Sequence, residues 1–225
     1  MDRFGVSIKG VLEVNGKFLL RKNQRLEYEL LGGHLEKEDS TAEQRLITEF
    51  EEESGIQIVV LEHREPWLYE VGSKNILIVP YLCSAVHIPD VLTDQDGGTL
   101  HWLSAEEAAA SLMPQGYKDT IRGEIPHRSD SAPSGSFFRI IPNYVERDYF
   151  VEVRVQEHGA ELMKAPLRHH CAPRDLIARE LGAMHRNAAL ISNPISIDHA
   201  HDTITLNYEI DNRIPHQEDI RLGKR

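Results

Sequence analysis

Apolar residues recur at every second position in several segments of this chain, which is typical of strands with one buried face. The clearest case is a predicted hairpin in which residues 6–13 and 17–21 flank Asn15-Gly16, a dipeptide that favours a tight turn between antiparallel strands. The same reasoning predicts further strands at 76–86, 137–141, 149–156 and 203–210, a strand and helix over 100–108, and a helix from 173 to about 187.

The strongest helical signal lies between Ser40 and Gly55. Ser40 is the predicted N-cap, Glu43 would complete a capping box three residues later, and Gly55 would end the helix. Successive helical residues rotate by about 100° around the axis. This rotation places three apolar residues on one side of the helix, namely Leu46, Ile47 and Phe50.

Another side of the same helix gathers Glu49, Glu52 and Glu53, with Arg45 beside them. This charge is unfavourable, because a helix C-terminus already carries partial negative charge and like charges four residues apart repel. A bound cation would offset both penalties. Oxygen ligands favour a hard divalent ion such as Mg²⁺, which substrate phosphates often complete. The alternative is an ordinary solvated face of the helix.

The stretch around this helix resembles the Nudix box, which is Gly, five residues, Glu, seven residues, then Arg-Glu-aliphatic-any-Glu-Glu-any-Gly-aliphatic. Gly33 is followed by five residues and Asp39, then by eight residues and Thr48-Glu49-Phe50-Glu51-Glu52-Glu53-Ser54-Gly55-Ile56. Asp39 replaces Glu, Thr48 replaces Arg, and one residue is inserted. We hypothesise that Arg45 takes over the work of the missing arginine, which in the family is expected to orient a metal-binding carboxylate.

The resemblance covers residues 1–125 and implies an α+β domain, the Nudix α/β/α sandwich with a mixed sheet. It also implies Mg²⁺-dependent hydrolysis, with Mn²⁺ as the alternative ion, of a pyrophosphate bond in a nucleoside diphosphate-linked substrate. Glu52 and Glu53 would be the principal metal ligands, and Glu49 a third ligand or the base. A carbonyl of the Gly32-Gly33 turn would complete the shell, and Gly33 is assigned to it. If Thr48 and the insertion misplace Glu49, the chain would instead be a nucleotide-binding sensor or scaffold.

Residues outside the box are candidates for substrate binding. The rings of Trp67 and Tyr69 would stack a base, or else pack in the core. Arg21 and Arg25 would meet phosphates, or else belong to a solvated basic turn. A further metal-binding acid from outside the box is sought among three residues, namely Glu70, Asp94 and Asp96.

The remainder of the chain divides by composition. Residues 126–136 are rich in Pro, Ser and Gly and are predicted to be a linker. Residues 137–225 resemble no family and are predicted to form a small α+β extension of unknown role, or extra strands added to the first domain. Histidines at 169, 170, 199 and 201 are candidate ligands of a second metal ion, although their spacing matches no zinc motif.

The acidic charge of the first half of the chain limits the classes of partner that it can bind. Residues 1–125 hold 12 basic and 22 acidic side chains, which argues against general nucleic-acid binding, because that depends on Lys and Arg neutralising phosphates. A small nucleotide brought in with a divalent ion suits this charge better. No apolar run is long enough for a membrane span, and the first residues lead directly into a strand. We therefore expect a cytoplasmic protein without a membrane partner, and the resemblance adds a homodimer as an option.

Overall fold

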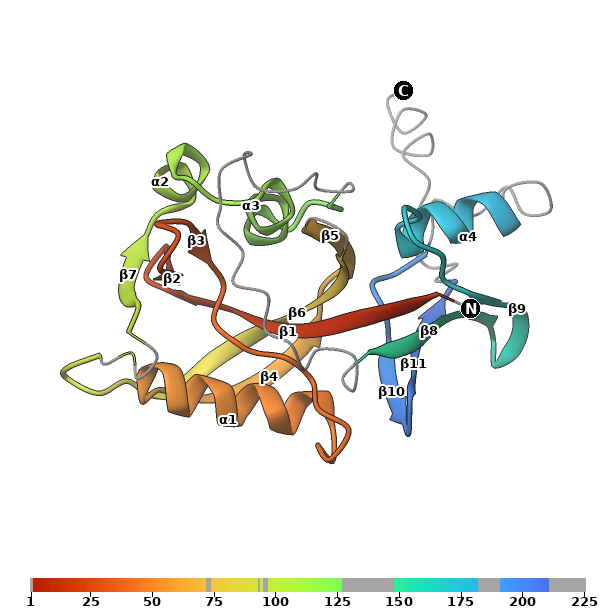
Figure 1. The fold of residues 1–225 in the computed structure, drawn as a ribbon, viewed down its shortest axis with the longest axis horizontal. Coiled ribbons are helices and arrows are strands. Elements are labelled where there is room, and N and C mark those ends of the chain that lie inside the picture. The colour runs from red at the N-terminus through yellow and green to blue at the C-terminus, as the bar shows by residue number, and fades with distance from the viewer. Residues whose placement is uncertain are drawn as a thin grey trace, which may run out of the picture.

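The computed structural model describes residues 2–71, 74–92, 94, 97–126, 148–181 and 191–210. The first part of the chain, up to residue 126, contains seven strands and three helices among these residues (Figure 1). Their bounds are β1 Arg3–Val14, β2 Lys17–Lys22, β3 Tyr28–Glu29, α1 Ala42–Ser54, β4 Gln57–His63, β5 Trp67–Val71, β6 Lys74–His87, β7 Thr99–Leu103, α2 Ala105–Ala110 and α3 Gln115–Arg122.

Strand β1 is the centre of the sheet. It runs parallel to β6 from Gly5↔Ile76 to Leu12↔Cys83, and antiparallel to β2 at Val14↔Lys17. The turn between β1 and β2 has positive φ angles at Asn15 and Gly16, as a two-residue hairpin requires. Parallel and antiparallel pairs thus share one sheet, which confirms the predicted mixed sheet and hairpin.

Helices cover both faces of this sheet (Figure 1). On one face, Phe50 of α1 packs with Ile8 of β1 in the larger hydrophobic cluster. On the other face, Tyr117 of α3 packs with Trp67 and with Val11 of β1 in a second cluster. Alternate residues of β1 therefore serve two cores, and the predicted α/β/α layering within an α+β fold is confirmed.

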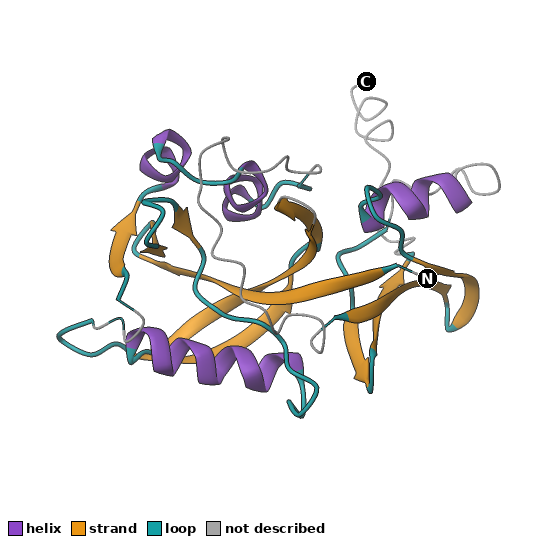
Figure 2. Cartoon of the chain, in the orientation of Figure 1, coloured by secondary structure: helices purple, strands orange, loops and turns teal. Residues whose placement is uncertain are grey.

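The C-terminal part adds strands to the same sheet (Figure 2). Strand β8 pairs with β1 at Arg3↔Phe150 and Phe4↔Tyr149, and β11 runs parallel to β8. The predicted strand at 149–156 shows the expected alternation of buried and half-buried residues. The described elements here are β8 Tyr149–Glu157, β9 Ala160–Pro166, α4 Pro173–Leu181, β10 Ser196–Ala200 and β11 Thr203–Glu209.

A buried ion pair ties the C-terminal part to the first half. The guanidinium of Arg174 on α4 donates to Glu65 at 2.7 Å, and the Tyr208 hydroxyl donates to the other oxygen of Glu65 at 3.1 Å. Burial raises the pKa of Glu65, whereas the neighbouring Arg174 lowers it. Because these partners are far apart in the sequence, the contact fixes the connection between β4 and β5 against α4 and β11.

Some predicted elements fall outside the described residues. These are the linker at 126–136, apart from Pro126, the strand at 137–141, and the second half of the helix predicted to reach residue 187. Within the part of the chain that the structure describes, no helix is long and apolar enough to cross a membrane.

Packing of α1 on β1 generates a stability prediction. A methyl group at Gly10 would lie 2.3 Å from the Phe50 ring, whereas at Gly5, on the same strand, it would lie 3.7 Å from its nearest neighbour. We expect Gly10→Ala to lower the free energy of unfolding by about 1–3 kcal/mol, the usual cost of overpacking. Urea denaturation measures it, with Gly5→Ala as the control. Equal effects of the two substitutions would contradict this account of the helix-sheet contact.

Candidate active site

Helix α1 begins one residue later than its sequence suggests. Thr41, not Ser40, is the N-cap, and its hydroxyl accepts a hydrogen bond from the Gln44 amide at 3.1 Å. Glu43 lies instead 3.5 Å from His63 of β4. The two neighbouring hydroxyl residues offer the same capping chemistry, so the sequence could not decide between them. Gly55 ends the helix as predicted, with a left-handed φ of 70°.

The Gly32-Gly33 turn lies along β1. Backbone hydrogen bonds run from Gly10 N to Leu31 O, from Ile8 N to Gly33 O and from Leu35 N to Val6 O, each 2.9–3.0 Å long. A side chain at Gly32 would meet the Ile8 carbonyl oxygen at 2.3 Å, and its φ of 122° also favours glycine. The glycine pair thus lets the turn lie directly against the central strand.

Two carboxylates of α1 reach this turn, and we call Glu49 and Glu53 the acidic pair. The Gly32 amide donates to Glu53 Oε2 at 2.8 Å. A methyl group on Gly33 would lie 2.1 Å from Glu49 Oε1, so the carboxylate occupies the space that a side chain would need. Both glutamates are buried, at 8% and 5% exposure. The helix therefore delivers two acids to one point on the turn.

Glu52 does not join the acidic pair, because its side chain is exposed. Residues four apart lie above one another on a helix, so Glu49 and Glu53 share the face that meets the turn while Glu52 falls beside it. Among the described residues, no group of three or more His, Cys, Asp or Glu side chains is arranged to hold a metal ion. The predicted trio is thus a pair in this structure.

Both carbonyl groups of the turn accept hydrogen bonds from β1. Gly33 O accepts the Ile8 amide of β1 at 2.9 Å, as part of the strand-like pairing. Gly32 O accepts instead from the ammonium of Lys9, also on β1. The Gly33 carbonyl is thus used in backbone pairing, whereas the Gly32 carbonyl is bonded to a side chain.

In addition to Lys9, two arginines lie beside the acidic pair. Arg45 forms an ion pair with Glu49, four residues along α1, so the contact expected from the sequence is present. Arg21 of β2 lies 3.4 Å from Glu53 Oε1, 2.6 Å from Asp94 and 3.5 Å from Glu29. Thr48 bonds back to the Gln44 carbonyl. Arg45 therefore contacts Glu49, whereas Thr48 contacts the backbone of its own helix.

Burial dominates the protonation of the acidic pair. It raises the pKa of Glu53 to about 6, although Lys9, the Gly32 amide and Arg21 lower it. Burial likewise raises the pKa of Glu49, against the opposing effects of Arg45 and Lys9. Burial thus makes both groups hold a proton more tightly than an ordinary glutamate.

The other predicted site residues are scattered. Arg25 is exposed and donates to Glu27 at 2.9 Å within its own turn. Trp67 is fully buried and packs edge-on against Tyr117 at 5.0 Å between ring centroids, so it lies in the core and leaves no ring face for a base. Tyr69, 6% exposed, packs beside it. Both rings thus occupy the core position that the sequence left as the alternative.

Among the candidate acids from outside the box, Asp94 is linked to the acidic pair through Arg21. The Arg21 guanidinium contacts both Asp94 and Glu53. Glu70 contacts His170 at 2.6 Å, on the C-terminal part. Asp96 lies outside the described residues.

Sequence reasoning missed Lys9, although a signal was available. A lysine within a continuous apolar strand that has neighbours on both sides is expected to lose much of the hydration of its ammonium. Lys9 is 7% exposed and lies in such a strand. Its buried charge requires a partner, which the Gly32-Gly33 turn and the acidic pair provide.

The residues present fit a divalent ion. Mg²⁺ is commonly held by one or two carboxylates, with water and substrate phosphates supplying the other oxygens. Glu49 and Glu53 would supply two carboxylates, and the carbonyl of Gly32, whose amide donates to Glu53, would supply a third oxygen. The same oxygens are in contact with Lys9, Arg21 and Arg45, so the site already contains positive charge.

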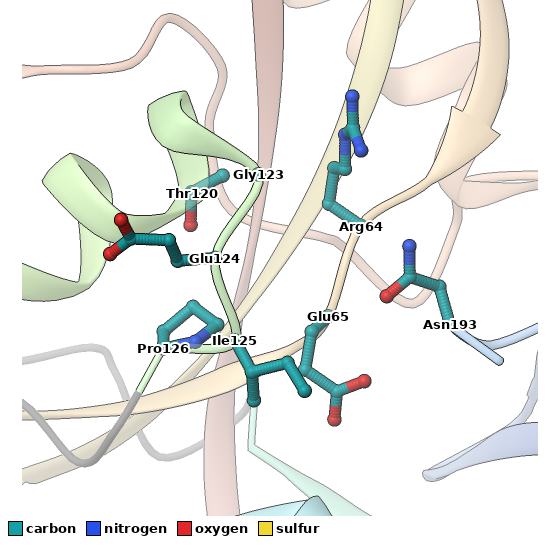
Figure 3. A pocket seen from close by; sticks show the side chains of 8 residues that line it. All are labelled: Arg64, Glu65, Thr120, Gly123, Glu124, Ile125, Pro126 and Asn193. Atoms are coloured by element: carbon teal, nitrogen blue, oxygen red, sulfur yellow. The ribbon is translucent and has the colours of Figure 1, made fainter. Parts of the chain in front are cut away.

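A pocket elsewhere in the molecule is separate from this site. It lies at the junction with the C-terminal part, where Arg64 and Glu65 face the end of α3 and Asn193 (Figure 3). Neither member of the acidic pair lines this pocket.

Comparisons with known proteins give structural matches alone. No protein-family model matches the chain, and no curated protein matches it either. A MutT protein from Methanosarcina mazei is similar over 53% of this chain and 91% of its own, with 19% identity and a TM-score of 0.46. A Nudix-family hydrolase from Clostridium perfringens matches over 54% and 95%, with 16% identity and a TM-score of 0.46.

A Nudix hydrolase from Nitrosomonas europaea is also similar, over 48% of this chain and 77% of its own. Its identity is 20% and its TM-score 0.44. About half of this chain is thus similar to solved Nudix structures.

The raised pKa of Glu53 generates a prediction about pH. The folded protein holds this proton more tightly than the unfolded chain, whose glutamate has a pKa near 4.5. Stability should therefore be greatest below pH 4.5 and fall as the pH rises through about 6, by about 2 kcal/mol for this group. Glu53→Gln should lack this fall, which chemical denaturation in a chelator would measure.

The control for this experiment is Glu51→Gln, since Glu51 is exposed on the same helix. It should keep the wild-type dependence on pH. Parallel curves for wild type and Glu53→Gln between pH 4.5 and 7 would contradict the assigned burial of this carboxylate.

Proposed function

We propose that the chain is a Nudix-type pyrophosphohydrolase, which hydrolyses a pyrophosphate bond in a nucleoside diphosphate-linked substrate with the help of Mg²⁺ or Mn²⁺. One observation carries the proposal. The acidic pair, on the last turns of α1, packs against a Gly-Gly turn that lies along the central strand. That arrangement agrees with the box-like sequence from Gly33 to Ile56.

In this proposal, Glu49, Glu53 and the Gly32 carbonyl hold the divalent ion. When bound, the ion lowers the charge on the phosphate oxygens and favours an attacking water. Arg45 fixes the carboxylate of Glu49, which either binds the ion or accepts the proton of the water. Phosphoryl transfer depends mostly on positioning and electrostatics, so no protein nucleophile is required.

Glu52 and Gly33, assigned to the metal by resemblance, have smaller roles in this proposal. Glu52 is exposed beside the acidic pair, where it would contact the ion through water. Gly33 provides the space that the Glu49 carboxylate occupies. Arg21 would meet a substrate phosphate from the edge of the site, where it already contacts Glu53.

The rest of the proposal concerns the whole protein. Residues 1–125 would be the hydrolase domain, and 137–225 an α+β domain that shapes specificity or dimerisation, with 126–136 as the linker. The substrate would be a small nucleotide, because the acidic first half is unsuited to general nucleic-acid binding. The protein would act in the cytoplasm. The proposal includes a homodimer as an option. The activity assay described below does not depend on the oligomeric state.

A second candidate function is a nucleotide-binding sensor or scaffold that does not hydrolyse its ligand. The observation that favours it is the set of ion pairs already made by Arg45 and Arg21 with the acidic pair. A panel of nucleoside diphosphate derivatives with Mg²⁺ separates the two functions. Nucleotide binding without product release on any compound would favour the sensor.

The hydrolase proposal is tested by matched substitutions on α1. We expect Glu49→Gln and Glu53→Gln each to lower kcat by about a hundredfold or more, since each removes a carboxylate from the ion or the water. Glu51→Gln, on the exposed side of the helix, should retain activity. Product release from the best substrate in the panel measures the effect. Wild-type turnover in both acidic-pair variants would overturn the proposed site.

A further inference from the structure

Lys9 is a buried cation that contacts the Gly32-Gly33 turn. It lies in the middle of β1, opposite Pro80 of the parallel strand β6, and only 7% of the residue is exposed. Its ammonium donates a hydrogen bond to the Gly32 carbonyl oxygen. That carbonyl is the third oxygen assigned to the ion above, so lysine and metal would use the same atom.

The ammonium also acts on both members of the acidic pair. Burial raises the pKa of Glu53 and of Glu49, and Lys9 opposes burial at both groups. By contrast, Arg45 contacts Glu49, and Arg21 contacts Glu53. Lys9 therefore acts electrostatically on both carboxylates, while its ammonium is hydrogen-bonded to the turn.

Burying an ammonium is costly unless it is paired and hydrogen-bonded. A lysine at this place is thus stabilised by the acidic pair, and it stabilises that pair in return. A divalent ion bound to the same oxygens would lie close to the ammonium, and two positive charges at that distance repel strongly in a buried site. Both cations cannot occupy the turn together.

We propose that Lys9 is the resident counter-ion of the acidic pair, and that a divalent ion binds by displacing its ammonium from the Gly32 carbonyl. This inference rests on the proposed function, since it assumes that the acidic pair binds a metal. It adds that the affinity for the metal depends on competition between the divalent ion and the Lys9 ammonium. The lysine side chain, with four flexible bonds, can withdraw without movement of the strand.

The test measures binding of Mn²⁺ to the full chain by calorimetry, without substrate. Lys9→Met keeps the length of the side chain and removes its charge. We expect it to bind Mn²⁺ at least about tenfold more tightly than wild type, which corresponds to about 1.4 kcal/mol. Lys17→Met, an exposed lysine on β2, is the control and should bind as wild type does.

Thermal unfolding gives a second measurement that detects misfolding. In a chelator, Lys9→Met should melt at a lower temperature than wild type, because the acidic pair loses its counter-ion. Adding Mn²⁺ should raise its melting temperature more than that of wild type. Lys9→Arg retains the charge and should show no tightening of Mn²⁺ binding, which guards against a general effect of substitution at this position.

The outcomes separate this inference from the proposed function. If wild type and Lys9→Met bind Mn²⁺ equally, and Glu53→Gln abolishes binding in both, Lys9 is no competitor although the metal site is real. If none of the proteins binds Mn²⁺, Lys9→Met included, the metal-dependent function fails and this inference fails with it. Tightening in Lys9→Met alone, lost again when Glu53→Gln is added, supports the displacement.

Discussion

The structure of the site depends on the contact between α1 and the Gly32-Gly33 turn. Burying Glu49 and Glu53 is unfavourable by itself, because carboxylates lose hydration and the end of a helix repels negative charge. The turn offsets this cost with the Gly32 amide, which donates to Glu53, and the missing side chain of Gly33 leaves room for the carboxylate of Glu49. The contact can form only because β1 holds the turn in register through three backbone hydrogen bonds.

Strand β1 therefore has several roles at once. It pairs with β6, β2 and β8, packs alternate residues into two hydrophobic clusters, and carries Lys9 to the site. Its pairing with β8 also joins the C-terminal part to the same sheet. A change that shifts β1 would thus disturb the turn, the acidic pair and the junction with the C-terminal part together.

Local signals in the sequence predicted the local structure well. The Asn15-Gly16 hairpin and the Gly55 helix end are confirmed, because each depends on backbone preferences of the residues themselves. The helical wheel also predicted that Arg45 would reach Glu49. It could not decide that Glu52 stays outside, since the wheel gives the angle between residues but not the direction in which the turn lies. The burial of Trp67 was equally undecidable, because its partner Tyr117 is fifty residues away.

The charges of the site follow from tertiary pairing, which no single segment reveals. Arg21, Arg45 and Lys9 come from two strands and a helix, and they meet only where the sheet and α1 converge. The two buried carboxylates thus have positive charge beside them within the protein. If the site binds a divalent ion as proposed, its affinity would reflect exchange between cations rather than simple attraction to negative charge. A phosphorylated substrate changes this balance, because its own negative charge can accept a cation that the metal displaces.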